Sequence, residues 1–97
     1  TARRITADEA LAYGLVTQVV EPDKLMDTCM EIAHKIAENG PIAVQQAKFA
    51  INKGMECSLD IGLGIEARAY AITIPTEDRI EGLNAFKEKR KPEYKGR

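Results

Sequence analysis

Several residue types that often mark a function are scarce in this 97-residue sequence. It contains no Trp, one His and two Cys. No apolar run approaches the roughly 20 residues that a membrane-spanning helix needs, so no membrane segment is expected. There is no Gly-rich phosphate loop, no ordered Ser, His and Asp set and no signal-peptide pattern. Cys29 and Cys57 lack metal-ligand spacing, and we expect free thiols in a reducing compartment, the cytoplasm or the mitochondrial matrix.

Charge of both signs is abundant instead. The sequence holds 14 Lys or Arg and 15 Asp or Glu, and 44% of its residues are hydrophobic. This composition is typical of a globular domain, and the length suffices for one small domain. The sequence opens on Thr1 rather than on Met, from which we expect it to begin inside a larger protein.

Capping signals and apolar periodicity divide the chain into helices. Thr6 and Glu9 have the spacing of a capping box, and Gly14 suits the position just after a helix. Another helix begins near Pro22, and its apolar stripe includes Cys29, which favours a core thiol over a nucleophile. The remaining helices are expected over about 41–53, 59–74 and 77–91, and residues 15–20 read as a short strand or extended link. The sequence predicts an all-α fold of about five helices with one short extended segment.

The expected helix over 59–74 is apolar on two opposite faces. One stripe consists of Leu59, Leu63, Ala67, Tyr70 and Ile74. The other consists of Ile61, Ile65, Ala69 and Ile72. The stripes lie roughly 200° apart around a helix, so both faces need a cover. We expect one face to pack within its own subunit and the other on a partner; the alternative is that other helices of the chain cover both.

The last expected helix starts and ends with clear signals. Thr76 is a good N-cap, and Pro92 stops the run. From Phe86 to Arg97 the sequence has six Lys or Arg against two Glu, although the whole chain sums to −1. Such a basic end could contact phosphates. The alternative is a solvated helix end whose cations match the helix dipole.

The same stretch carries a resemblance to a known family. Residues 79–96 are similar to the C-terminal signature of the enoyl-CoA hydratase (crotonase) family, roughly E-G-x-x-A-F-x-E-K-R-x-P-x-[FY]-x-G. Residues 6–16 resemble the family segment A-x-E-A-x-x-x-G-L-V, and residues 40–48 also have a counterpart there. The resemblance covers nearly all of this chain but only about the last third of a family member. Residues 51–56 and 74–79 most resemble the methylglutaconyl-CoA hydratase branch, although isomerases and decarboxylases share the C-terminal motifs.

The resemblance implies a fold, an activity and an assembly. Family members form a spiral of ββα units followed by a helical part that makes trimers, often paired into dimers of trimers. On this resemblance, residues 1–21 are the end of an incomplete spiral core, and residues 22–97 are the C-terminal helical oligomerisation region. The family adds water across the double bond of an acyl-CoA thioester, so coenzyme A belongs to the substrate and no cofactor or metal is expected. The catalytic glutamates and oxyanion hole of relatives lie upstream, and no residue here is assigned as catalytic.

The resemblance does imply one binding role within this chain. Phe86 and Lys89 match the Phe and the Lys of the signature. In relatives these reach the coenzyme A site of a neighbouring subunit, near the adenine and the 3′-phosphate. The physical properties suit that role, because a ring packs on flat apolar surfaces and an ammonium is a point charge for phosphate. Charge alone does not separate Lys89 from Arg90.

Two other function classes stay open from the residues. The methylglutaconyl-CoA hydratase branch includes an RNA binder, and Phe86 and Tyr94 beside basic residues could stack on bases. The second alternative is a non-catalytic helical interaction module.

Overall fold

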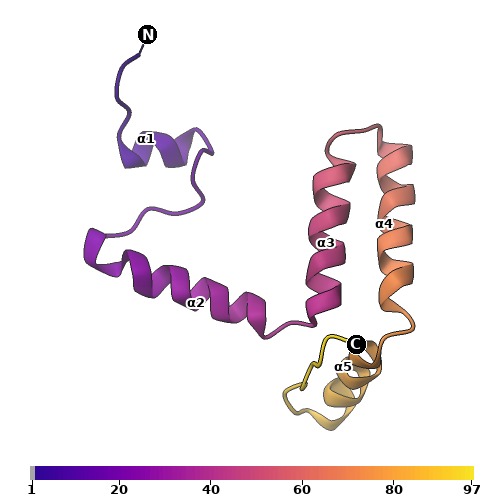
Figure 1. The fold of residues 1–97 in the computed structure, drawn as a ribbon. Coiled ribbons are helices and arrows are strands. Elements are labelled where there is room, and N and C mark those ends of the chain that lie inside the picture. The colour runs from indigo at the N-terminus through magenta and orange to yellow at the C-terminus, as the bar shows by residue number, and fades with distance from the viewer. Residues whose placement is uncertain (1) are drawn as a thin grey trace. The chain divides into compact units, whose positions relative to one another are not determined.

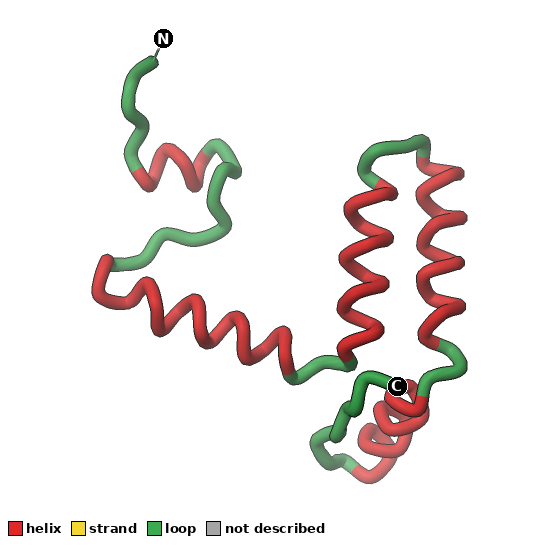
Figure 2. The backbone as a smooth tube through the Cα atoms, viewed as in Figure 1, coloured by secondary structure: helices red, strands yellow, loops and turns green. Residues whose placement is uncertain are grey.

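The computed structural model describes residues 2–97, which contain five α-helices, one short 3₁₀-helix and no strand (Figures 1 and 2). This confirms the all-α prediction. Residues 15–20 are irregular, so of the two expectations for them the link is the one found. The chain divides into two compact units, one up to Ala33 and one from His34 to Arg97.

The first unit begins with α1 (Ala7–Ala12), which has the predicted capping box. The Thr6 hydroxyl accepts from the Glu9 backbone N–H at 3.2 Å, and the Glu9 carboxylate accepts from the Thr6 N–H at 2.9 Å. Gly14 follows with φ +71°, the left-handed geometry that glycine tolerates best. An ion pair with Arg3 lowers the pKa of Glu9.

Helix α2 (Leu25–Ala37) follows a 3₁₀ turn, η1 (Pro22–Lys24). Its apolar stripe is present, but Leu25, Ile32 and Ile36 all remain exposed. The expectation that Cys29 is a core thiol is wrong for the described chain, because Cys29 is exposed. Periodicity identified the apolar face correctly, but it carries no information about what covers that face.

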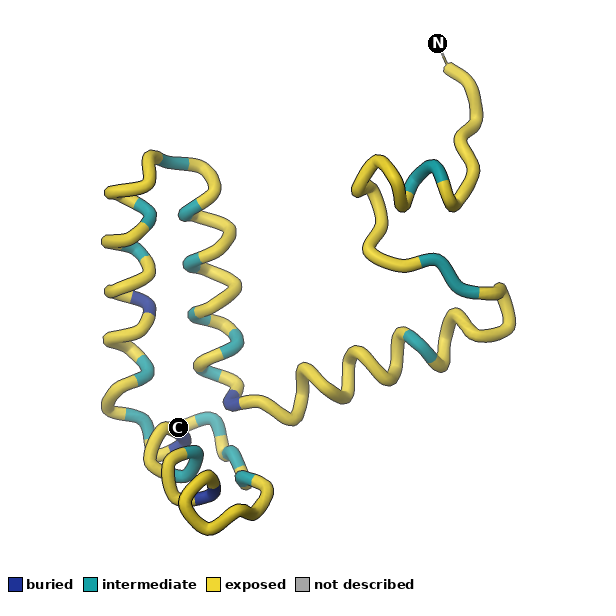
Figure 3. The backbone as a smooth tube through the Cα atoms, turned by 180° about the vertical axis from the view of Figure 1, so that it is seen from behind, coloured by how far each residue is buried: buried dark blue, intermediate teal, exposed yellow. Residues whose placement is uncertain are grey.

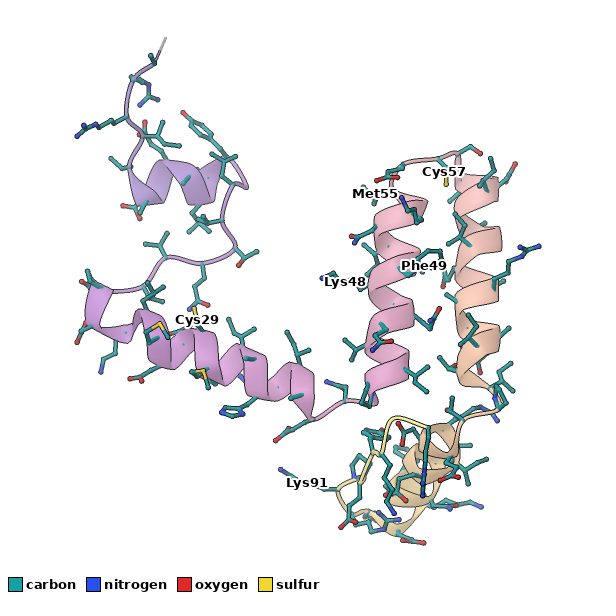
Figure 4. All side chains as sticks on the ribbon, in the orientation of Figure 1. Cys29, Lys48, Phe49, Met55, Cys57 and Lys91 are labelled. Carbon is teal, nitrogen blue, oxygen red and sulfur yellow. The ribbon has the colours of Figure 1, made fainter. Side chains whose placement is uncertain are left out.

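In the second unit, α3 (Pro41–Gly54) and α4 (Leu59–Thr73) form a pair of neighbouring helices (Figure 1). Small residues allow a close approach at the connected ends. A Cβ added to Gly62 would lie 3.5 Å from the Gly54 Cα atom. Met55 and Cys57 lie in the connection itself (Figure 4). The Cys57 thiol donates to the Lys53 and Gly54 carbonyls, which ties the turn to the end of α3.

Few side chains are fully buried (Figure 3). Within residues 2–97, the buried apolar side chains are those of Ala69 and Ala85. Both predicted stripes of α4 keep large side chains exposed. The exposed members are Leu59, Leu63, Tyr70 and Ile74 on one stripe and Ile61 and Ile72 on the other. The described residues therefore leave apolar side chains uncovered on both faces of α4. Across residues 2–97, each helix is too short or too polar to span a membrane.

Candidate functional site

Helix α5 (Glu77–Glu88) starts as the sequence predicts. The Thr76 hydroxyl accepts from the Arg79 backbone N–H at 3.2 Å and donates to the Thr73 carbonyl at 2.7 Å. It therefore caps α5 and also ties the cap to the end of α4. Glu77 and Asp78 add negative charge to the first turn, where the helix dipole favours it.

The end of α5 differs from a simple stop at Pro92. Helical geometry ceases at Glu88, and Lys89 adopts the left-handed conformation with φ 55° and ψ 37°. The Arg90 N–H donates to the Ala85 carbonyl at 3.0 Å, and the Lys89 N–H donates to the Phe86 carbonyl at 3.3 Å. This pair of bonds is the Schellman motif, in which the left-handed position is usually Gly. A lysine there carries a backbone cost of about 1–2 kcal/mol relative to glycine.

Arg90 holds the residues after this turn through a group that we call the Arg90 clamp, made of Arg90, Glu81 and Glu88. The guanidinium donates from both terminal nitrogens to the two carboxylate oxygens of Glu81, with Nη2 to Oε2 at 2.9 Å. Its Nε donates to Glu88 Oε2 at 2.6 Å. Glu81 Oε1 also accepts from the Glu93 backbone N–H at 2.8 Å. The bonds from Arg90 and Glu93 lower the pKa of Glu81 to about 2, so its carboxylate is ionised at neutral pH.

The tail, residues 91–97, folds back along α5 and is held by Asp78 (Figure 1). The buried carboxylate of Asp78 accepts from the Lys95 N–H at 2.6 Å and from the Gly96 N–H at 2.8 Å. The Asp78 N–H in turn donates to the Arg97 carbonyl at 3.1 Å. Asp78 thus pairs the first turn of α5 with residues 17–19 positions later, which no local sequence signal predicted.

Tyr94 fills the space between the tail and two glycines. A Cβ added to Gly82 would lie 3.1 Å from the Tyr94 hydroxyl, and one added to Gly40 would lie 3.7 Å from its Cδ1 atom. The half-buried ring therefore packs on α5 and on the start of α3. Tyr94 thus has a packing role in this unit, and RNA binding stays a prediction.

The two predicted site residues lie on the outside of this structure. Phe86 is 85% exposed, which is extreme for an aromatic side chain in a well-formed helix. Lys89 is exposed too, and no hydrogen bond or ion pair of its ammonium occurs within residues 2–97. Arg90, by contrast, is occupied by two carboxylates. Lys89 and Arg90 thus differ in the structure, because Arg90 has two carboxylate partners and Lys89 has none within residues 2–97.

Other tail cations have carboxylate neighbours as well. Arg97 Nε lies 3.0 Å from Glu77 Oε2. Lys91 projects away from the tail and approaches Glu38 at 3.8 Å (Figure 4). Both pairs are highly exposed, so each contributes little to stability.

A second feature of this unit is an apolar groove of about 730 Å³ along α3 and α4. Exposed Ile51, Met55, Leu59, Leu63 and Tyr70 are among the residues that line it. The lining holds few groups capable of acid–base chemistry, so the groove suits an apolar partner surface better than a reaction. Within residues 2–97, no cluster of three or more His, Cys, Asp or Glu could hold a metal ion.

Comparison with known proteins agrees with the motif. The family model described as enoyl-CoA hydratase/isomerase matches residues 1–97, the full length of the sequence. The chain belongs to the enoyl-CoA hydratase/isomerase family. The residues of the Arg90 clamp, Phe86, Lys89 and Tyr94 therefore all lie within a family-matched region.

Relatives of this hydratase/isomerase family chain come from bacteria and from mitochondria. The Bacillus subtilis protein YngF, named as an enoyl-CoA hydratase/isomerase, is 59% identical over 96 residues, covering 99% of this chain and 37% of the relative. The human mitochondrial methylglutaconyl-CoA hydratase is 48% identical over 100 residues, covering 99% of this chain and 30% of the relative. A crystal structure of an enoyl-CoA hydratase from Bacillus anthracis superposes with a TM-score of 0.96 at 56% identity, covering 98% of this chain and 37% of that one. The chain thus spans about a third of the length of the relatives that it matches.

Sequence reasoning missed the groups that shape this site. No role in the site was predicted for Asp78 or Glu81, and charge alone did not separate Arg90 from Lys89. For Glu81, Gly82, Arg90 and Tyr94 the signal available was their match to letters of the signature, whereas Asp78 lies before its first letter. These are the residues that close the tail onto α5.

Proposed function

We propose that the protein containing these residues is an enoyl-CoA hydratase, which adds water across the double bond of a 2-enoyl-CoA thioester. The family match supports this, together with the hydratase names of several relatives. In this proposal residues 22–97 are the C-terminal helical part, and residues 1–21 belong to the spiral core. The catalytic groups come from that core, so this region serves binding and assembly.

The binding role falls to Phe86 and Lys89, which contact the coenzyme A portion of a substrate held by a neighbouring subunit. The observation that carries this proposal is the state of Lys89. Its backbone bears the cost of a left-handed conformation, and its ammonium has no partner within residues 2–97. Backbone strain that no contact of the residue within the chain offsets is common at functional positions. Phe86, one turn earlier and almost fully exposed, offers a flat apolar face beside that charge.

Lys89→Ala in the full-length enzyme tests this role. A well-formed charge-assisted contact is worth roughly 1.5–3 kcal/mol, and exposure reduces that value. The loss should raise KM and leave kcat nearly unchanged, because the contact is remote from the reacting carbons and equal in ground and transition states.

The informative comparison is between a CoA thioester and its dephospho-CoA counterpart, which lacks the 3′-phosphate. Lys89→Ala should weaken binding of the first and barely affect the second. Lys91→Ala is the matched control, since it removes another exposed lysine two residues away. Equal losses on both substrates would show that Lys89 does not contact the phosphate.

The assembly role falls to the exposed face of α4. We infer that it packs on another subunit in a trimer or a dimer of trimers. Support comes from the large apolar side chains on both stripes that the chain itself leaves uncovered. A helix with two such faces is stable only when both are covered.

Substitutions on α4 test the assembly role. Ile61 is 59% exposed, so Ile61→Asp should leave the chain's own packing intact while placing a carboxylate in the subunit contact. Ile65→Asp is less informative, because Ile65 is half-buried already. Ala71→Asp adds the same carboxylate at an exposed position outside both stripes and is the control. Sedimentation velocity should show dissociation for Ile61→Asp only; unchanged assembly with native circular dichroism would refute the contact.

The proposal also covers the cellular compartment of the protein and RNA as an alternative partner. The free thiols Cys29 and Cys57 suit a reducing compartment, the cytoplasm or the mitochondrial matrix. RNA binding remains the alternative partner class, and a steep salt dependence of RNA affinity would be its signature.

A further inference from the structure

The two residues next to Lys89 in the sequence are joined by a hydrogen bond between their side chains. These neighbours, Glu88 and Arg90, are joined at 2.6 Å. Arg90 is also held at Glu81, two turns back on α5, by two parallel bonds. The paired geometry fixes the plane of the guanidinium as well as its position. The residues flanking Lys89 are therefore fixed relative to the body of the helix.

The same carboxylate fixes the chain beyond the turn. Glu81 Oε1 accepts from the Glu93 N–H as well as from Arg90. Arg90 and Glu93 are thus both bound to the Glu81 carboxylate. These bonds fix the direction of the backbone between residues 90 and 93 relative to α5. The Schellman bonds close the turn from the helix side, and the clamp closes it from the tail side.

The clamp also changes which charges can reach one another. Glu81 and Glu88 are the carboxylates nearest along the helix to the turn, and both are engaged by Arg90. These three charges sum to −1, but each carboxylate is bound to Arg90, and the ammonium of Lys89 has no ion pair within residues 2–97.

We propose that Glu81 and Arg90 are positioning residues for the coenzyme A contact, which hold Lys89 in its left-handed turn and keep its ammonium free for a phosphate group. This rests on the proposed function of Lys89. Arg90 touches no ligand in this scheme. Its effect on binding passes entirely through Lys89.

The test uses the full-length enzyme with Arg90→Gln and Glu81→Gln. Each variant should raise KM for a CoA thioester about tenfold and leave kcat nearly unchanged, while KM for the dephospho-CoA counterpart changes little. Discrimination is the ratio of KM for the dephospho-CoA thioester to KM for the CoA thioester. When Lys89→Ala is already present, adding Arg90→Gln or Glu81→Gln should not lower this ratio further. A merely structural role would lower thermal stability and affect both thioesters alike in both backgrounds.

Two controls separate the possible failures. Glu77→Gln breaks the exposed Glu77–Arg97 pair at the other end of α5 and should leave discrimination unchanged. Arg90→Lys keeps the charge but loses the paired geometry, so it serves if Arg90→Gln does not fold and should retain only part of the discrimination. If Lys89→Ala reduces discrimination but none of the clamp variants does, the positioning role is refuted and the proposed function stands. If Lys89→Ala itself does not change discrimination, the proposed contact of Lys89 with coenzyme A is refuted, and the positioning role is refuted with it.

Discussion

Replacing Lys89 by glycine separates the cost of its backbone from the use of its side chain. At φ 55° and ψ 37° a residue with a Cβ is strained by about 1–2 kcal/mol, and glycine is not. Glycine gives back about 0.4–1 kcal/mol through the greater freedom of the unfolded chain. Lys89→Gly should therefore be more stable than Lys89→Ala by about 1 kcal/mol, because alanine keeps the strain and both lack the ammonium.

The assay is urea unfolding of both variants and the parent protein at one protein concentration, since assembly makes the midpoint concentration-dependent. Binding of a CoA thioester is measured on the same samples. Lys89→Gly should unfold at the highest urea concentration and bind as weakly as Lys89→Ala. That pattern would mean that the protein gives up stability to keep a lysine at this turn.

Two results would refute the reasoning in different ways. Equal unfolding midpoints for the glycine and alanine variants would show that the left-handed turn carries no strain. Full binding by Lys89→Gly would show that the lysine side chain is not used, and the backbone geometry would then need another explanation.

The other predictions concern pH and the packing of the tail. Because the pKa of Glu81 is lowered to about 2, its contribution to stability is complete above about pH 4.5 and is lost as the pH falls through 2. Urea midpoints of the parent should therefore fall more between pH 4.5 and 2 than those of Glu81→Gln, and parallel curves would contradict the role of the clamp. Gly82→Ala should unfold more easily than Gly64→Ala by about 1–3 kcal/mol, because a Cβ at Gly82 meets the Tyr94 hydroxyl at 3.1 Å whereas one at Gly64 meets nothing within 4 Å. Thermal melts of the two variants would show this, and equal melting temperatures would mean that the Tyr94 ring moves aside without cost.

The helices and their N-terminal caps could be predicted because their causes are local. The bonds between Thr6 and Glu9, and between Thr76 and Arg79, join residues three apart. Such contacts follow from residue type and spacing alone.

The return of the tail could not be predicted in this way. It depends on Asp78 meeting the N–H groups of Lys95 and Gly96, which lie 17 and 18 residues away. Nothing in the local pattern distinguishes that carboxylate from an ordinary first-turn acid. The exposure of the apolar face of α2 was missed for a related reason. An apolar stripe in the sequence does not show which residues, if any, pack on it.

The candidate site shows the same division. The match to the signature singled out Phe86 and Lys89, whereas their exposure and the ion pairs of Arg90 came only with the coordinates. Whether they contact coenzyme A stays a prediction.

The pairing of the tail cations has a consequence for how this surface looks to an approaching anion. By sequence, residues 86–97 carry an excess of four positive charges. In the folded unit, Arg90, Lys91 and Arg97 each have a carboxylate within 4 Å, contributed by Glu81, Glu38 and Glu77 from outside that segment. Lys87, Lys89 and Lys95 have no such pair within residues 2–97. An approaching anion therefore meets three unpaired lysines rather than the six cations that the sequence places in this segment.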